Sequence, residues 1–307
     1  MPSALSERPE QEPLTNPRSD RVRSVARLSG RSARQRAGRF LVEGPQAVRE
    51  AVTCAPGGLR ELYVTAPAAQ RYPEILAAAA GAGVRARPVS EDVFAAMVVD
   101  GGTLSPQGLL AVCDLIGADL AEVVAARPRL VAVLSQVRDP GNAGTVIRAA
   151  DAAGADAVVL TGASVDVHNP KVVRSTAGSL FHLPVVTGIE LADALRELRR
   201  AGLRVLAADG AGDVDLDDLA DDADDADRSD PTGDGESGLL RRNVAWVFGN
   251  EAWGLREEDR ALADAVVRVP VHGRAESLNL ATAATVCLYA TARAQRAGER
   301  RKRPRGV

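Results

Sequence analysis

The sequence has few of the residues that build disulfide scaffolds and metal centres. Its 307 residues include three cysteines, Cys54, Cys113 and Cys287, and no two of them form a CxxC pair. An odd number of widely spaced cysteines indicates a reducing compartment, without structural disulfides or a zinc ribbon. The three histidines also lack metal-ligand spacing. We therefore expect no metal cofactor.

Long apolar runs are also missing. The first twenty residues, MPSALSERPEQEPLTNPRSD, have no apolar core and do not resemble a signal peptide. The most apolar segment, Leu278 to Ala294, is shorter than a membrane span and contains Asn279 and three threonines, so it predicts a packed helix. A hydrophobic content of 46% is enough to fill the cores of two ordinary domains. We expect a soluble, cytoplasmic protein without a membrane partner.

Lysine is scarce, and the charges are unevenly distributed. Only two of the 38 basic residues are lysine, which we read as a coding bias. Residues 213–236 hold eleven Asp and one Glu against one Arg, a balance of −11; since the whole chain carries −3, the remainder carries +8. Residues 21–39 hold seven Arg, and residues 293–305 hold six Arg and one Lys. A single basic run usually marks a solvated face, but two such blocks favour a polyanionic partner.

Alternating apolar and polar segments predict two α/β domains. Several short apolar runs in the second half are continuous, as in strands that are buried on both faces of a parallel sheet. These runs are 130–134, 157–160, 204–207, 244–248 and 265–269. The predicted organisation is a disordered N-terminus (1–20), a small α/β domain (21–117), a helical linker (118–128), a parallel-sheet domain (129–297) with a disordered acidic insertion (211–238), and a basic tail (298–307).

Three polar, Gly-containing clusters each follow a predicted strand. They are QVRDPGNAGTVIR (136–148), FGNEAWGL (248–255) and VPVHGRAESLNLATAATVCLYA (269–290). Because the carboxyl ends of parallel strands meet at one edge of a sheet, the three clusters can form one site. Each also has a structural explanation: Arg148 as a surface residue, Trp253 as packing between helix and sheet, and Ser277 as a helix N-cap. The GxGxxG fingerprint is absent, which disfavours a Rossmann NAD enzyme.

Together, these segments carry a resemblance to a known family. NAGTVIR, FGNEAWGL and VPVHGRAESLNLATAATV resemble the three signature motifs of the SpoU (TrmH-type) RNA 2'-O-ribose methyltransferases of the SPOUT superfamily, over residues 130–294. GRSARQRAGRFLVEGPQAVREAV resembles the L30e-like substrate-binding domain that often precedes them. The resemblance implies a parallel sheet with a C-terminal trefoil knot, S-adenosylmethionine as the methyl donor, a homodimer, and ribosomal RNA, most simply 23S rRNA, as the substrate.

The resemblance also implies the residues of the site. The cofactor residues implied are Gly249, Val269 and Leu278. The catalytic residues implied are Arg148 at the ribose hydroxyl, with Asn142, Glu251, Ser277 and Asn279 as polar companions. Since a guanidinium stays protonated, we expect Arg148 to orient the hydroxyl and stabilise the developing oxyanion rather than to act as a base. The residues predicted to contact RNA are Arg31, Arg34, Arg36, Arg39, Lys171 and Arg174.

Other functions remain open from the sequence. A tRNA 2'-O-methyltransferase or a catalytically inactive RNA-binding paralogue would share these motifs. The sequence does not identify the target nucleotide, and it does not separate a housekeeping enzyme from one that confers antibiotic resistance.

Overall fold

The computed structural model describes residues 12–98, 107–229 and 238–302. The chain divides into two compact units, residues 1–115 and 116–307, and each is described by itself. This boundary lies two residues before the predicted end of the first domain.

The first unit is a four-stranded sheet with helices on both faces. The strand order is β1-β4-β2-β3, in which β2 and β3 are parallel and the other neighbours are antiparallel. The strands are β1 (Arg39–Glu43), β2 (Leu59–Val64), β3 (Ala86–Pro88) and β4 (Leu109–Asp114). The helices are α1 (Asp20–Ala26), α2 (Arg31–Ala37), α3 (Pro45–Cys54), α4 (Ala66–Arg71), α5 (Pro73–Gly81) and α6 (Glu91–Met97). The predicted small α/β domain is confirmed.

The prediction of a disordered N-terminus is wrong for residues 12–20. The Leu14 amide donates to the Pro88 carbonyl (3.0 Å), and the Ser90 amide donates to the Leu14 carbonyl (3.0 Å). Through these bonds, Leu14 forms a parallel bridge with Val89, next to the edge strand β3. The bridge satisfies backbone amide and carbonyl groups that would otherwise bind water. Residues 1–11 lie outside the described residues.

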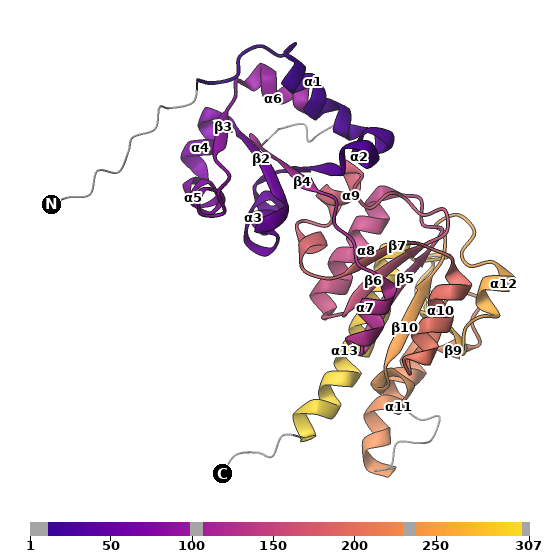
Figure 1. Ribbon diagram of the computed structural model, residues 1–307. Helices are drawn as coiled ribbons and strands as arrows, with labels where there is room; N and C mark the ends of the chain where they lie inside the picture. Colours follow the sequence, from indigo (N-terminus) through magenta and orange to yellow (C-terminus); the bar gives the residue numbers. More distant parts are fainter. Residues whose placement is uncertain (1–11, 99–106, 230–237, 303–307) are drawn as a thin grey trace, which may run out of the picture. The chain divides into compact units, whose positions relative to one another are not determined.

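The second unit contains a seven-stranded parallel sheet, as predicted. Its order is β7-β6-β5-β10-β8-β11-β9 (Figure 1). The strands are β5 (Leu130–Ser135), β6 (Ala157–Thr161), β7 (Val185–Ile189), β8 (Arg204–Ala208), β9 (Val214–Asp215), β10 (Val244–Phe248) and β11 (Ala265–Arg268). All five predicted strands are present. The sequence analysis did not predict β7 and β9, which form the two edges of the sheet. An edge strand has a neighbouring strand on one side only and is less buried, so it does not require a continuous apolar run.

Helices cover both faces of this sheet, with α7 and α10 on one face and α8 and α13 on the other (Figure 1). The helices are α7 (Leu120–Ala125), α8 (Pro140–Ala153), α9 (Pro170–Ser175), α10 (Leu191–Arg200), α12 (Glu257–Arg260) and α13 (Leu280–Lys302). The predicted linker is helical but is part of the domain, because Leu120 and Val123 of α7 join the core cluster of the sheet. Since α13 continues to Lys302, the predicted start of a tail at residue 298 is wrong.

The acidic stretch is ordered where the structure describes it. β9 pairs with β11 and leads directly into α11 (Leu216–Ser229). Leu216, Leu219 and Ala223 are buried, while the acids between them face solvent. Their spacing of three and four residues makes an amphipathic helix, so acidic composition alone misled the prediction of disorder over 211–238. Residues 230–237 lie outside the described part.

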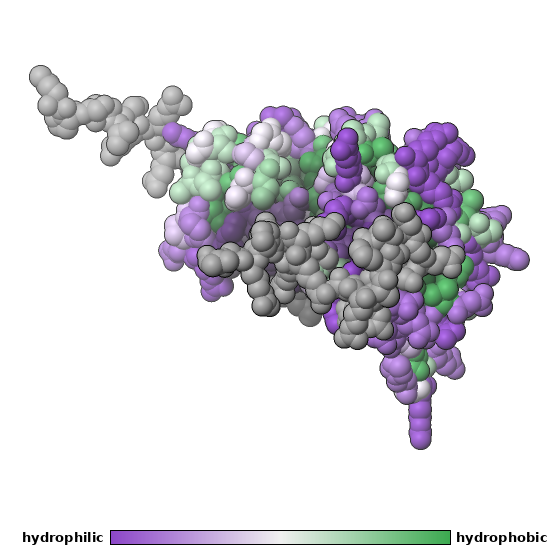
Figure 2. All heavy atoms as spheres, turned by 90° about the horizontal axis from the view of Figure 1, so that it is seen from below, coloured by the Kyte–Doolittle hydropathy of each residue, from purple (hydrophilic) through white to green (hydrophobic). Residues whose placement is uncertain are grey.

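The exposed large apolar side chains of the described residues are concentrated in one part of the sequence. They are Trp253, Val271, Leu278, Val286 and Tyr289. Hydrophilic residues occupy much of the face drawn in Figure 2, between smaller apolar patches. Among the described helices, none combines the length and apolar character needed to cross a membrane.

Candidate functional site

The loops after β5 and β10 are joined at the carboxyl edge of the sheet. The two strands are parallel neighbours, with Leu134 in register with Phe248. Just beyond the end of β5, Gln136 turns the chain with a positive φ of 54°, a backbone conformation that few side-chain-bearing residues adopt. The Asn250 side chain donates to the Gln136 carbonyl (2.8 Å) and so holds the two loops together.

A chain of hydrogen bonds links all three sequence clusters. The Glu251 carboxylate accepts from the Asp139 amide (3.1 Å) and from the Asn142 side chain (3.3 Å). Asn142 in turn accepts at its Oδ1 from the side chain of Asn279 (3.0 Å). The predicted convergence of the three clusters is therefore confirmed. The side chain that Glu251 contacts in this network is therefore Asn142.

Arg148 lies on the same helix as Asn142, six residues or less than two turns further along α8. Its side chain is exposed, and it makes no hydrogen bond or ion pair with the residues that the structure describes. A guanidinium that has no partner among the described residues is free to bind an anion or a polarised hydroxyl. Ser277 is also exposed, on the loop that precedes α13.

Asn279, rather than Ser277, caps α13. Its Oδ1 accepts from the amides of Ala281 (2.9 Å) and Thr282 (3.4 Å), and its carbonyl accepts from Ala283. The structural alternative for Ser277, that it is the N-cap of this helix, is therefore wrong. The side-chain amide of Asn279 contains both an acceptor and a donor. Its oxygen caps the helix, while its nitrogen donates to Asn142.

The three predicted cofactor residues line one cavity of about 670 Å³. Gly249 follows β10, Val269 follows β11, and Leu278 lies on the loop before α13. A Cβ on Gly249 would lie 2.4 Å from the Gly254 carbonyl carbon, so only glycine allows the loop to close this tightly. Apolar side chains together with main-chain groups form a wall that suits a nucleoside-like ligand.

Sequence reasoning missed the loop after β8. Ala208, Asp209 and Gly210 line the same cavity, and the Asp209 carboxylate accepts from the Leu255 amide (3.4 Å). Arg260 pairs with the other oxygen of Asp209 (3.5 Å). The signal was available: the strand over 204–207 also ends in a polar, Gly-containing turn, as the other three strands do.

Glycine also sets the position of α8. A Cβ on Gly144 would lie 2.4 Å from the Ser175 Cβ and 2.6 Å from the Val172 carbonyl oxygen. Gly144 therefore permits close packing of α8 against α9.

The predicted RNA-contacting residues differ in exposure. Arg31, Arg36 and Lys171 are exposed, and Arg174 is partly buried. Arg39 is half-exposed and lies within 4.0 Å of the carboxylates of Glu61 and Asp114.

Arg34 contradicts the prediction of an RNA contact. Its side chain is 2% exposed, and its guanidinium donates to the carbonyls of Leu28 and Ser29. Arg34 therefore holds the turn between α1 and α2.

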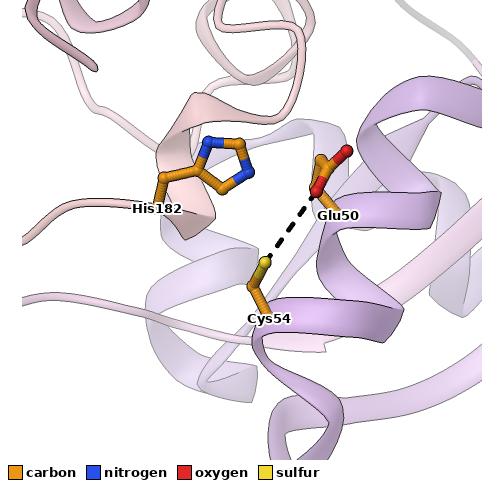
Figure 3. A group of neighbouring side chains, drawn as sticks. All are labelled: Glu50, Cys54 and His182. Carbon is orange, nitrogen blue, oxygen red and sulfur yellow. Dashed lines mark hydrogen bonds between the residues drawn. The ribbon is translucent and has the colours of Figure 1, made fainter. Parts of the chain in front are cut away.

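Among the residues that the structure describes, neither unit by itself holds a complete set of metal ligands. In α3, the Cys54 thiol lies 3.8 Å from Oε2 of Glu50, one helical turn away (Figure 3). His182, also labelled there, belongs to the second unit, where its Nδ1 lies 2.8 Å from Oδ2 of Asp151. The two residues of α3 fall short of the four ligands of a structural zinc site. The absence of a metal cofactor stays a prediction.

Comparisons with known proteins agree with this arrangement. Residues 129–289 match the model of the SpoU rRNA methylase family, and residues 19–111 match an MRM3-like substrate-binding domain. A 23S rRNA (guanosine(2553)-2'-O)-methyltransferase from Bacillus subtilis is 32% identical over 276 residues, covering 90% of this chain and 97% of that protein. A 23S rRNA (uridine(2479)-2'-O)-methyltransferase from Streptomyces viridochromogenes is 33% identical and covers 89% of each chain.

A solved structure is also similar. The AdoMet-bound rRNA methyltransferase from Sinorhizobium meliloti superposes with a TM-score of 0.73 and 29% identity, over 92% of this chain and 97% of that one. The fold and the site thus define an α/β RNA-modifying protein with a nucleoside-sized cavity. The chain belongs to the SpoU rRNA methylase family.

Proposed function

We propose that this protein transfers a methyl group from S-adenosylmethionine to a ribose 2'-hydroxyl of 23S ribosomal RNA. The observation that carries the proposal is the hydrogen-bonded chain Glu251–Asn142–Asn279. It joins three distant segments, the first of which also carries Arg148 on α8, and it shares Glu251 with the cofactor cavity. The relatives named above act on 23S rRNA, and the Sinorhizobium structure contains AdoMet, which supports both substrate and cofactor.

The cavity residues fit the cofactor. Gly249, Val269 and Leu278 would enclose the adenosyl group, and when bound, the sulfonium supplies the methyl group. Three carboxylates (Asp209, Glu251 and Glu276) and two arginines (Arg260 and Arg268) line the cavity, so the lining carries one net negative charge, which suits a cationic ligand.

Arg148 orients the attacking hydroxyl. Its protonated guanidinium donates hydrogen bonds to the 2'-oxygen and the neighbouring phosphate, and it stabilises the negative charge that develops on the 2'-oxygen as the hydroxyl proton passes to that phosphate. Asn142, held between Glu251 and Asn279, fixes the first turn of α8 and with it the position of Arg148. Ser277 is exposed on the loop, where its hydroxyl can contact the ribose.

The exposed arginines of α2 and Lys171 of α9 hold RNA phosphates in this proposal. The first unit serves as the substrate-binding domain, in line with its family match. We place the protein in the cytoplasm, where ribosomes are assembled.

We further propose that the chain is knotted at its C-terminal part and forms a homodimer. The insertion of β10 between β5 and β8 supports a threaded topology. Val286 and Tyr289 of α13 are 40% and 48% exposed and lie three residues apart on one helix face, as expected for an uncovered interface. Sedimentation velocity should give a dimer, and Tyr289→Glu should give a monomer; a monomeric wild type would refute the dimer.

The activity is tested with tritiated S-adenosylmethionine and total RNA from cells that lack the protein. Label in alkali-resistant dinucleotides from the 23S rRNA supports ribose methylation of rRNA. Label in tRNA alone would support the tRNA enzyme, and cofactor binding without labelled RNA would support an inactive paralogue.

A further inference from the structure

Trp253 is the most exposed large apolar residue of the described chain, with 50% of its surface accessible. The sequence left open whether it packs a helix against the sheet, and an indole that is half in water does not do so. An exposed indole is unfavourable, because its large apolar surface remains in contact with water. A half-exposed indole at the rim of a cavity therefore suggests a surface that a ligand covers.

The loop that carries Trp253 holds it rigidly. Asn250 and Gly254 exchange two backbone hydrogen bonds of 2.9 Å each, which closes a five-residue loop. The Asn250 Oδ1 also accepts from the Ala252 amide (2.8 Å). Glu251 ties the same loop to Asn142, so the loop that carries the indole has a fixed position relative to the polar chain Glu251–Asn142–Asn279.

A cation lies over the indole. The guanidinium carbon of Arg138 is 5.3 Å from the centroid of the Trp253 ring, within the range of a cation–π contact. Arg138 immediately precedes Asp139, the N-cap of α8, so it comes from the loop on the other side of Glu251. The indole and the guanidinium thus come from two of the three clusters and meet at the edge of the site.

We infer that Trp253 and Arg138 form a stacking clamp for an unpaired nucleobase at or beside the target nucleotide. The base stacks on the face of the indole that Arg138 leaves open, and the guanidinium binds the adjoining phosphate, which holds the target ribose at this edge of the site. This inference rests on the proposed function and deepens it: the substrate presents its target in a loop or bulge, where a base can leave its helix. Trp253 and Arg138 are positioning residues.

Fluorescence tests the contact directly, because the chain has two tryptophans in different surroundings. Trp246 is buried and its Nε1 donates to Thr291 (2.8 Å), whereas Trp253 is half exposed. The difference between the emission of wild type and Trp253→Phe reports Trp253 alone. A 23S rRNA fragment with S-adenosylhomocysteine should quench this difference emission. Equal quenching in wild type and Trp253→Phe would overturn the inference.

Steady-state kinetics test the role. Trp253→Leu keeps the apolar bulk but loses the aromatic face, and should raise the KM for rRNA about tenfold, with a smaller change in kcat. Trp253→Phe should keep the KM within about threefold, because any flat ring can stack. The Kd of S-adenosylmethionine without RNA should stay within about twofold in both variants.

Two outcomes would refute the clamp. If Trp253→Leu weakens S-adenosylmethionine as much as rRNA, the indole is a wall of the cofactor cavity. If the KM for rRNA is the same in all variants, the indole does not touch the base. In either case a wild type that methylates rRNA leaves the proposed function intact, whereas a wild type that methylates no RNA refutes the function itself.

Arg138 has a matched control. Arg138→Gln should raise the KM for rRNA several-fold and lower the slope of log KM against log salt by about 0.7, the value of one single-stranded phosphate contact. Arg196→Gln removes an equally exposed arginine that pairs with Asp193 on α10, and should change neither quantity. An unchanged salt slope in Arg138→Gln would remove Arg138 from the clamp.

Discussion

The basic helix of the first unit and the carboxyl edge of the second sheet were both selected from the sequence by residue type, and they behave differently. At the sheet edge, Asn142 bonds to both Glu251 and Asn279. Each of these two partners lies more than a hundred residues further along the chain, and they belong to separate loops. In residues 31–39, neighbouring arginines turn in different directions: Arg34 is buried, whereas Arg36 is exposed.

The physical cause of this difference is geometry. Parallel strands deliver their ends to one edge, so polar residues placed there converge. A short helix sends successive side chains around its axis, about 100° apart, so a dense run of one charge is spread over several surroundings. Convergence of distant residues is therefore better evidence of chemistry than local density of charge.

Arg148→Ala tests the sheet edge most severely. We expect methyl transfer to fall by about a thousandfold or more, because the variant loses the donor that stabilises the oxyanion. The Kd of S-adenosylmethionine, measured by calorimetry, should stay within about tenfold. Survival of methylation in this variant would remove Arg148 from the reaction.

Gly249→Ala tests how tightly the second loop closes. The new Cβ would lie 2.4 to 2.6 Å from three backbone atoms of Gly254 and Leu255, so the loop must shift and the Kd of S-adenosylmethionine should rise about tenfold or more. Gly273 is the control, since a Cβ there meets nothing within 4 Å. Equal affinities of Gly249→Ala and Gly273→Ala would show that the close approach does not matter to the cofactor.

Arg34→Met separates the arginines of the first unit. Removing the guanidinium leaves the carbonyls of Leu28 and Ser29 without this buried donor, and we expect a loss of about 1 to 3 kcal/mol in the free energy of unfolding of the first unit, followed in urea.

The paired variant Arg31→Gln/Arg36→Gln should leave that stability within about 0.5 kcal/mol. It should raise the KM for rRNA several-fold and flatten its salt dependence. The comparison fails if the double variant unfolds as easily as Arg34→Met, or if Arg34→Met alone changes the salt slope.

The reactivity of the cysteine thiols is the mildest test. It compares how well the cores of the two units protect their buried cysteines. Burial raises the pKa of Cys113 in β4 and of Cys287 in α13 to about 12, so neither forms thiolate near pH 8 in the folded protein. Cys54 is exposed. A disulfide reagent at pH 8 should therefore modify one thiol in the native protein and three in urea. Rapid modification of two or three native thiols would indicate that one of these cores opens.

Much of the second unit was predictable because its signals are local. The apolar runs that form β5 and β10 are continuous, and the loops after them carry the polar clusters. The edge strand β7 was missed because Thr187 and Gly188 break its apolar run. The acidic stretch was wrongly predicted to be disordered because only its charge was considered, and the helical spacing of its apolar residues was not. Leu216 and Leu219 lie one turn apart and bury one face of α11.

The sequence by itself determined the parallel sheet, the three loops at its edge and the residue types that could act there, since strand and turn preferences act over a few residues. Only the tertiary structure decided which side chains meet. Asn279 caps α13 and reaches Asn142 across 137 residues, and Arg34 is enclosed by its own turn. Partners of this kind depend on distances that packing sets between remote segments, and no local pattern in the chain encodes them.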